Sequence, residues 1–211
     1  MIILGNNSAY APDLFAPSLP PLPALGDRID NKATVVGILQ DHEGNNYILA
    51  VVDAAYRSGS AMTWSSKMTD TVLNNNSSES SAKADHHTGK YSTDLILNTY
   101  TATDYPAFNF ARNACTVTFN GTTYYSVLPS VNELQLLNNN KDVLDQYDPT
   151  VSEYSSRSMS TFKFGGQYGC WATNEREYEE SWFCFSNGGF ESTDKTENRC
   201  GVCPVICIPL S

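Results

Sequence analysis

The sequence has little charge, and most of the charge is negative. Charged residues make up 17% of the chain, and 23 Asp and Glu against 13 Lys and Arg give a formal net charge of −10. About a quarter of the residues of a typical globular protein are charged. Because an acidic surface repels phosphate backbones, we do not expect nucleic acid as a partner. The chain also lacks an apolar run of about eighteen residues, so no membrane insertion is predicted.

The sequence lacks the common catalytic motifs. It contains no G-x-S-x-G elbow, no H-E-x-x-H pair and no P-loop. Glycosidase chemistry needs two carboxylates at a defined separation in a cleft. Four carboxylates crowded on one short segment are better explained as surface charge, and this applies to Glu175, Glu177, Glu179 and Glu180. We therefore expect a protein that is not an enzyme and needs no cofactor.

A secretory signal is also missing at the start of the given sequence. Its first residues have no basic stretch followed by a long apolar one. We therefore expect a chain made and retained without Sec export. Without export, cysteines are expected as free, buried thiols rather than as a disulfide framework. The six occur at positions 115, 170, 184, 200, 203 and 207.

One cysteine pair has metal-ligand spacing. Cys200 and Cys203 form a C-x-x-C, but no second such pair and no histidine pair accompanies it. In a strand, side chains three positions apart face opposite sides. No metal site is predicted.

Polar uncharged residues fill the place of the missing charge. Asn, Ser and Thr account for 59 of the 211 residues. Their side chains compete for backbone hydrogen bonds and favour turns, loops and strand faces over helix interiors. The composition predicts a loop-rich protein that contains strands.

The first half of the chain predicts a hairpin, a loop and two helices. Residues 33–56 are two apolar runs separated by a turn at 41–46 that contains Gly44. Residues 74–89 are poor in apolar side chains and predict an exposed loop, with His86 and His87 solvated. A helix is expected from Leu95 to Tyr100 with its cap among residues 92–94. A second helix, interrupted at Pro106, continues over 107–115, with Phe108 and Ala111 facing inward.

The second half carries stronger signals. Asn120-Gly121 predicts a tight hairpin turn. Ser130 and Glu133 have capping-box spacing at the start of a helix. Leu134, Leu137, Val143 and Leu144 lie near helical spacing on one face of it. Three strands are expected around Trp171, at 182–185 and at 202–208.

The segment after Trp171 mixes core and surface character. Trp171 and Trp182 are expected to hold two strands in the core, with residues 174–181 as an exposed loop between them. That loop is either merely solvated or a binding loop, since function concentrates on loops held by a rigid frame.

Residues 1–26 predict an extended arm rather than part of the folded body. Five prolines within 12–23 disfavour helix and sheet and favour a polyproline-like conformation. A floppy tail is one interpretation. The segment is also apolar, which favours an arm that docks on a partner or a neighbouring subunit through Leu14, Phe15, Leu19, Leu22 and Leu25.

The order of motifs over residues 27–211 resembles the Lcl C-terminal domain family. The segments that carry the resemblance are NNYILAVVD, AMTW, HHTGKYSTDLI, YPAFNFA, YYSVLPSVNELQLL, CWATNE, SWFCFSNGG and CPVICI. LPSVNEL followed by WATNE is the most specific part. The chain departs from the family pattern at Tyr125, where Trp is usual, at Ala172 and Asn174, and at 203–205, where Arg-Pro-Val is usual.

The resemblance implies an α+β, C-type-lectin-like fold. Such a fold has a twisted antiparallel sheet, two or three helices and long loops that face ligands. Modules similar to this family are mostly noncatalytic and occur in bacterial surface proteins and in phage receptor-binding and virion fibre proteins. The fold is also related to formylglycine-generating enzymes, which use paired thiols. Calcium is conceivable at Asn174 and Glu175, but their spacing departs from the lectin pattern and no metal is expected.

These observations lead to a functional hypothesis. We expect a noncatalytic bacteriophage virion protein, a fibre or appendage subunit assembled in the host cytoplasm and exposed on the particle. Its partners would be other virion proteins through the arm, further copies of the chain, with a trimer favoured, and a host-surface glycan or protein. A bacterial surface adhesin and, less favoured, a formylglycine-generating-enzyme-like oxidase are the alternatives. The expected ligand residues are Arg176, Tyr178, Glu179, Asn187 and Phe190.

Overall fold

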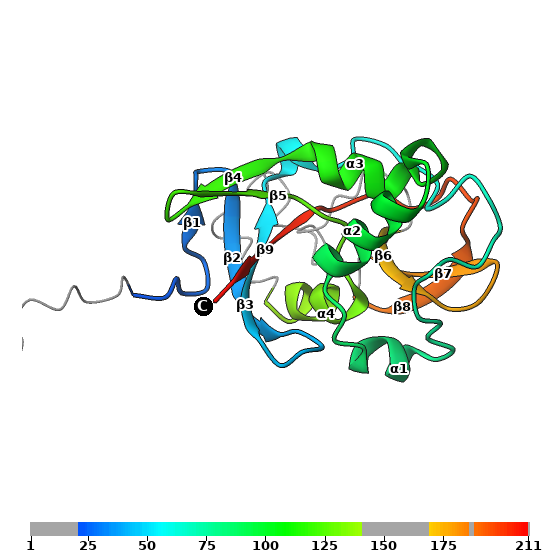
Figure 1. Cartoon of the computed structure of the whole chain (residues 1–211), viewed down its shortest axis with the longest axis horizontal. Helices are drawn as coiled ribbons and strands as arrows, with labels where there is room; N and C mark the ends of the chain where they lie inside the picture. The colour runs from blue at the N-terminus through cyan, green and yellow to red at the C-terminus, as the bar shows by residue number, and fades with distance from the viewer. Residues whose placement is uncertain (1–20, 141–168, 186–187, 211) are drawn as a thin grey trace, which may run out of the picture.

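The computed structural model describes residues 21–140, 169–185 and 188–210. In this part of the chain the fold is α+β, with three curled antiparallel sheets and a few short helices. Figure 1 shows the blue N-terminal strands and the red C-terminal strand side by side, with the helices and the third sheet extending away from them. None of the described helices has the length and apolar character needed to cross a bilayer.

The largest sheet joins the two ends of the described chain. Its strands lie in the order β1-β2-β3-β9, and every pair is antiparallel. The predicted turn at 41–46 is confirmed, and Gly44 adopts a positive φ of 88° there, a conformation that glycine allows without steric cost. The bounds of the strands are β1 Arg28–Ile29, β2 Ala33–Gln40, β3 Asn46–Val52 and β9 Val205–Pro209.

Strands β3 and β9 are buried on both faces over most of their length, which explains their unbroken apolar runs. Alternate residues of β3, Tyr47, Leu49 and Val51, pack into one cluster with α4 (Val131–Asn139) and the third sheet. The residues between them, Ile48 and Ala50, pack into another cluster beneath the β4–β5 hairpin. The sheet is thus the central layer of the described fold.

Two smaller sheets complete the strands. The hairpin β4 (Thr116–Phe119) and β5 (Thr122–Tyr125) turns at Asn120-Gly121 with both residues at positive φ, as the sequence predicts. The third sheet contains β6 (Gly169–Glu175), β7 (Glu180–Phe185) and β8 (Phe190–Asp194) in that order. The sequence analysis missed β8.

Of the helices, α4 packs between the first and third sheets, in contact with β2, β6 and β7. α3 (Pro106–Ala114) begins at the proline that was expected to interrupt it, because proline is well suited to the first helical position. Phe108 and Ala111 are fully buried, as predicted. The capping box of Ser130 and Glu133 at the start of α4 is confirmed, and Leu134 and Leu137 are buried; Val143 and Leu144 lie outside the described residues.

Two predictions for the first half are wrong. The segment 74–89 is not a plain loop: it contains α1 (Glu79–Ala84), which is capped by Ser78. The next helix, α2 (Gly89–Thr99), begins six residues before the predicted Leu95, and Thr88 rather than residues 92–94 caps it. Ser92 and Thr93 are instead buried inside the helix. Thr93 Oγ1 accepts a hydrogen bond from Leu128 N, so this hydroxyl does not cap a helix end.

The predicted arm meets the body just before β1. The backbone of Gly26 donates to Val35 O at 2.9 Å, which ties the chain to β2. Leu22 and Leu25 are 61% and 37% exposed, so the described end of the arm presents apolar side chains to its surroundings. Leu14, Phe15 and Leu19 lie outside the described residues.

None of the six cysteines forms a disulfide, and all six are buried, as the sequence analysis expected. Cys200 and Cys203 pack into different core clusters. Burial raises the pKa of Cys200 to about 12, so its thiol stays protonated. Neither thiol is exposed to solvent.

Trp171 and Trp182 tie the third sheet to the segment that precedes α1. Both are buried, Trp171 Nε1 donates to Met62 O at 2.7 Å, and Trp182 Nε1 donates to Asn76 O at 2.8 Å.

Replacing either tryptophan by alanine should lower the free energy of unfolding by about 3–5 kcal/mol, because the change leaves a cavity and removes a hydrogen bond. Tyr178→Ala, on an exposed turn, should change it by less than about 0.5 kcal/mol. Urea denaturation measures both, and a loss under about 1 kcal/mol for Trp171→Ala would contradict this placement.

Candidate ligand-binding site

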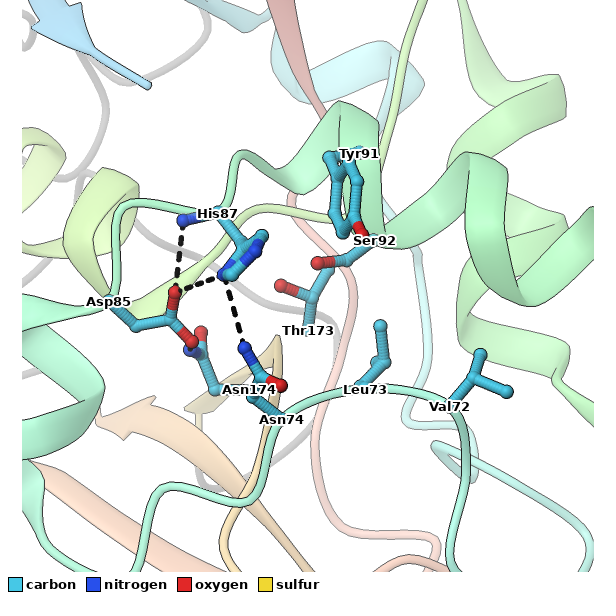
Figure 2. A pocket seen from close by; sticks show the side chains of 9 residues that line it. All are labelled: Val72, Leu73, Asn74, Asp85, His87, Tyr91, Ser92, Thr173 and Asn174. Atoms are coloured by element: carbon cyan, nitrogen blue, oxygen red, sulfur yellow. Dashed lines mark hydrogen bonds and ion pairs between the residues drawn. The ribbon is translucent and has the colours of Figure 1, made fainter. Parts of the chain in front are cut away.

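A small pocket lies where the C-terminal end of β6 meets the start of α2. It has a volume of about 60 Å³ and is lined mainly by polar side chains from four separate segments. Figure 2 shows these side chains around the pocket: Val72, Leu73, Asn74, Asp85, His87, Tyr91, Ser92, Thr173 and Asn174. No sequence motif joins them, because the fold alone brings residues 72–74 to residues 173–174.

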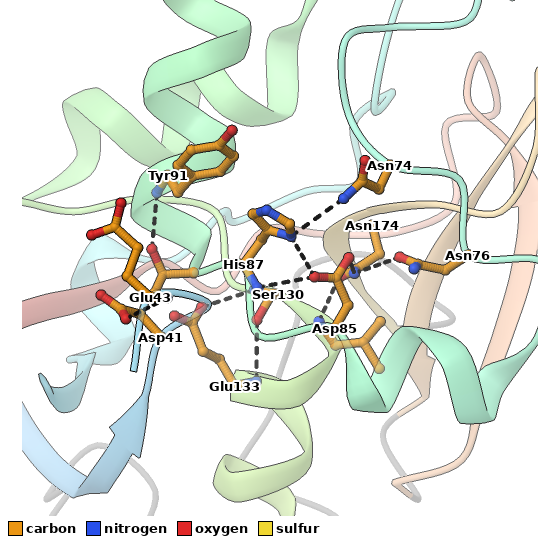
Figure 3. Close-up of polar contacts among 12 residues, drawn as sticks. Asp41, Glu43, Asn74, Asn76, Asp85, His87, Tyr91, Ser130, Glu133 and Asn174 are labelled. Carbon is orange, nitrogen blue, oxygen red and sulfur yellow. Dashed lines mark hydrogen bonds and ion pairs between the residues drawn. The ribbon is translucent and has the colours of Figure 1, made fainter. Parts of the chain in front are cut away.

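Asn174 fixes the floor of the pocket. Its Oδ1 accepts from Val131 N, the first residue of α4, at 2.8 Å, and its Nδ2 donates to Asn76 Oδ1 at 2.9 Å. The same Nδ2 lies 3.4 Å from Asp85 Oδ2. One buried amide therefore connects β6, α4, the 74–76 segment and the loop before α2 (Figure 3).

Asp85 and His87 form a hydrogen-bonded pair at the pocket wall. His87 Nδ1 lies 2.6 Å from Asp85 Oδ1, and His87 N donates to the same oxygen at 3.0 Å. The short contact makes Nδ1 the protonated nitrogen, so in the neutral ring Nε2 is an acceptor. The two side chains are 11% and 24% exposed. The pair can thus offer a ligand both carboxylate and imidazole acceptors.

An aromatic stack stands beside this pair. The ring centroids of His42 and His87 are 4.3 Å apart, and Tyr91 lies 4.8 Å from each. Tyr91 is 41% exposed, so part of its ring is open to a ligand. Aromatic faces bind the apolar faces of polar ligands such as sugars.

The position of α2 relative to the pocket is set by Glu133. Its fully buried carboxylate accepts from Gly89 N at 3.1 Å, Ser130 N at 2.8 Å and Tyr47 Oη at 3.0 Å. Cys207 Sγ donates to it at 3.3 Å. Figure 3 shows Glu133 next to Ser130, beneath the loop that carries His87. The carboxylate thereby fixes the helix end from which Tyr91 projects.

Gly89 is required by this close approach rather than by its backbone angles. A Cβ there would lie 2.2 Å from Leu128 O and 2.6 Å from Glu133 Oε2. Any side chain would push α2 away from the carboxylate and would disturb the pocket.

The turn between β6 and β7 follows the pocket residues Thr173 and Asn174 along the chain and holds three of the predicted ligand residues. Arg176 donates to Glu180 Oε2 at 2.8 Å and to Ser192 Oγ at 2.7 Å. Tyr178 is 50% exposed and Glu179 is also exposed. These three residues do lie together on one turn, with Tyr178 and Glu179 directed to the surface.

A buried ion pair supports the turn from below. Lys195 Nζ pairs with the Glu175 carboxylate, and both side chains are almost fully buried. The same Nζ donates to Tyr178 O at 2.9 Å, and Lys195 N donates to Glu179 O at 2.9 Å. Burial raises the pKa of Glu175, and the hydrogen bond and charge of Lys195 oppose that shift. The turn is therefore anchored at two consecutive carbonyls.

The structure corrects two further predictions. The loop expected at 174–181 is only a short turn, because Asn174 and Glu175 are buried at the end of β6 and Ser181 is buried in β7. Phe190 is not a surface ligand residue: it is 7% exposed, starts β8 and packs in the core with Lys83 Nζ 5.0 Å from its ring centroid. Asn187 lies outside the described residues.

The calcium and dithiol chemistries considered from the sequence have no assembled site in the described ranges. Glu175 is occupied by Lys195 and by Thr71 Oγ1 at 2.8 Å, and Asn174 by its protein partners. No cluster of three or more His, Cys, Asp or Glu side chains with metal-binding geometry occurs in the described residues. Within those residues, no serine, threonine or cysteine side chain is hydrogen-bonded to His87.

Comparisons with protein-family models, with curated proteins and with solved structures find no match to this chain.

The acceptor role of Glu133 gives a pH-dependent prediction. Burial raises the pKa of Glu133 above its ordinary value of 4.5, although hydrogen bonds from Ser130 and Gly89 oppose the shift. The unfolded chain therefore loses this proton first, and the contribution of Glu133 to stability falls as pH rises from 4.5 toward the folded pKa. In Glu133→Gln, an amide NH₂ would face backbone N–H donors. This variant should lose roughly 1–3 kcal/mol at the acid end of that window.

Urea denaturation at several pH values tests this. The difference in unfolding free energy between the wild type and Glu133→Gln should shrink as the pH rises, because glutamine does not titrate. A difference that grows with pH would show that Glu133 is stabilised as the carboxylate and would contradict the raised pKa. Gln135→Glu, at a half-buried position of α4, is the control for an added titrating group; Gln135 Nε2 donates to Asn139 within the helix.

Proposed function

We propose that this chain is a noncatalytic bacteriophage virion protein, a fibre or appendage subunit whose C-type-lectin-like domain binds a host-surface ligand. The observation that carries the proposal is the pocket at the end of β6. It combines carboxylate, amide and imidazole groups with an exposed tyrosine ring, the mixture that recognises sugar hydroxyls and the apolar face of a sugar ring. Its volume of about 60 Å³ suits one edge of a sugar rather than a whole ring.

The arrangement of strands supports the lectin-like part of the proposal. β9 pairs with β3, so the two ends of the described domain lie in one sheet. The pocket and the β6–β7 turn belong to the chain between these strands, and both are attached to the end of β6. The proposed ligand residues are Asn74, His87 and Tyr91 at the pocket and Tyr178 and Glu179 on the turn.

The thiols support assembly in a cytoplasm. Six buried cysteines that form no disulfide are usual for a protein that folds in a reducing compartment. In this proposal the chain folds in the host cytoplasm and becomes exposed on the particle. Leu22 and Leu25, both exposed, support an arm that binds other virion proteins or further copies of the chain, with a trimer favoured.

Substitutions in the pocket test ligand binding. Tyr91→Ala should weaken attachment of the purified protein to host cells, or to a panel of host-surface glycans, by about 2 kcal/mol, because Tyr91 gives a large rigid contact area. Asn74→Ala should weaken it less, and both variants should keep the melting temperature of the wild type. Asn113→Ala is the matched control, since Asn113 is exposed on α3 and donates to Asn109 of the same helix.

Binding that is unchanged in Tyr91→Ala, Asn74→Ala and Tyr178→Ala would reject the receptor role. The protein would then be better explained as a structural component of a particle. Attachment that persists without any particle assembly would favour a bacterial adhesin.

Deletion of residues 1–23 tests the arm. The truncated protein should fold and keep its ligand, because the hydrogen bond from Gly26 N to Val35 O, which ties the chain to β2, is left in place. It should fail to join particles, since the exposed Leu22 and the predicted docking residues Leu14, Phe15 and Leu19 are removed. Incorporation is measured by mass spectrometry of purified particles, and normal incorporation of the truncated protein would contradict this role.

A further inference from the structure

A second cavity, distinct from the pocket, lies between α2, α3 and β5. Its volume is about 230 Å³, and its lining includes Lys90 and Asp94 of α2, Arg112 of α3, and Thr123 and Tyr125 of β5. These three elements meet in Figure 1, on the opposite side of α2 from the third sheet. The cavity is smaller than the roughly 300–1,000 Å³ sites that take drug-sized ligands, and is comparable with a single sugar ring.

The lining has more hydrogen-bond donors than acceptors. Lys90 Nζ donates to Asp94 Oδ2 at 2.7 Å, and an Arg112 terminal nitrogen donates to Asp94 Oδ1. One carboxylate is thus shared by two cations. Arg112 Nε is buried and has no hydrogen-bond partner in the described part of the chain. Because that nitrogen has no accessible surface, a ligand in the cavity would meet the outer part of the guanidinium, whose side chain is 27% exposed.

The local charge is opposite to that of the whole protein. Two cations against one carboxylate leave the lining positive, whereas the chain has a net charge of −10. Although partial burial opposes it, hydrogen bonds from Lys90 and Arg112 lower the pKa of Asp94, so the carboxylate stays ionised and holds both cations in place. A preorganised positive lining on an acidic protein selects anions.

The remaining lining suits a sugar. Tyr125 is 59% exposed at the edge of the cavity and presents its ring to solvent. Thr123 adds a hydroxyl that can donate or accept. An aromatic face beside cationic donors fits a ring that has one apolar face and one carboxylate.

We propose that this cavity binds an acidic sugar residue, with the sugar carboxylate at Arg112 and Lys90 and the sugar ring against Tyr125. The inference rests on the proposed host-glycan function for its biological role, and it specifies the substrate class: a glycan that contains uronic-acid units. Inorganic phosphate is also an anion but has no ring, so it separates an acidic-sugar site from a general anion site.

Titration of the full-length protein tests the proposal. Glucuronate is added while protein NMR signals are followed, with glucose and inorganic phosphate as parallel probes. Glucuronate should give saturable shifts, and glucose and phosphate should bind about tenfold more weakly or not at all. Lys90→Gln and Tyr125→Ala should each weaken glucuronate binding by about tenfold. Both residues are exposed, so the variants should keep the wild-type melting temperature.

The matched control is Lys67→Gln. Lys67 is 56% exposed and pairs with Asp104, as Lys90 is 53% exposed and pairs with Asp94, but it lies outside the cavity. Equal glucuronate binding by Lys90→Gln and the wild type would overturn the proposal. Equal affinity for phosphate and glucuronate would overturn its sugar part.

Host attachment of the same variants separates the two proposals. Glucuronate binding that needs Lys90, with attachment unaffected by every variant of either site, would confirm the cavity and reject the receptor role. Attachment that needs Tyr91, with no glucuronate binding, would reject the cavity alone.

Discussion

The buried carboxylate of Glu133 is the constraint on which most of the described structure depends. It receives hydrogen bonds from the start of α2, the start of α4, a tyrosine of β3 and a cysteine of β9. Four segments that are far apart in the sequence therefore meet at one side chain. A buried acid is costly unless its oxygens are satisfied. Here each donor depends on the others being in place, so the central sheet and the two helices must assemble together.

Asn174 and the Glu175–Lys195 pair do for the third sheet what Glu133 does for the first. Asn174 and Glu175 are the last two residues of β6. Asn174 joins the sheet to α4 and to the segment before α1, and Lys195, paired with Glu175, joins it to a carbonyl of the β6–β7 turn. Replacing a buried ion pair by apolar residues is often neutral for stability, so its clearest effect is on geometry. The pair holds the β6–β7 turn, whose side chains are exposed, in one position. Loops with few buried contacts are more mobile.

Turns and helix caps that depend on one short segment could be predicted from the sequence. The Asn120-Gly121 turn, the capping box at Ser130 and the hairpin around Gly44 each depend on neighbouring residues, and each is confirmed. The sequence also placed Arg176, Tyr178 and Glu179 on one exposed surface. The start of α2 was missed because its cap, Thr88, follows two histidines in a polar stretch without periodicity.

Features that depend on distant residues could not be predicted. Glu175 looked like one of several surface glutamates, and only the position of Lys195 twenty residues later explains its burial. Phe190 follows a Gly-Gly pair and resembled a loop aromatic, yet pairing with Cys184 makes it the first residue of a core strand. The pocket joins 72–74, 85–92 and 173–174, and no periodicity or spacing relates these segments.

Helix α2 links the two sites that we propose. Its first turn carries Tyr91 toward the pocket, and Lys90 and Asp94 of the same turns line the cavity on another face. Adjacent helical positions point about 100° apart, so neighbouring residues serve two different surfaces. Both surfaces are then fixed by the same contact, Gly89 against Glu133, where a side chain has no room. A glycan long enough to reach both would encounter two sites at a fixed separation, which raises the affinity for extended chains over single sugars without a further contact.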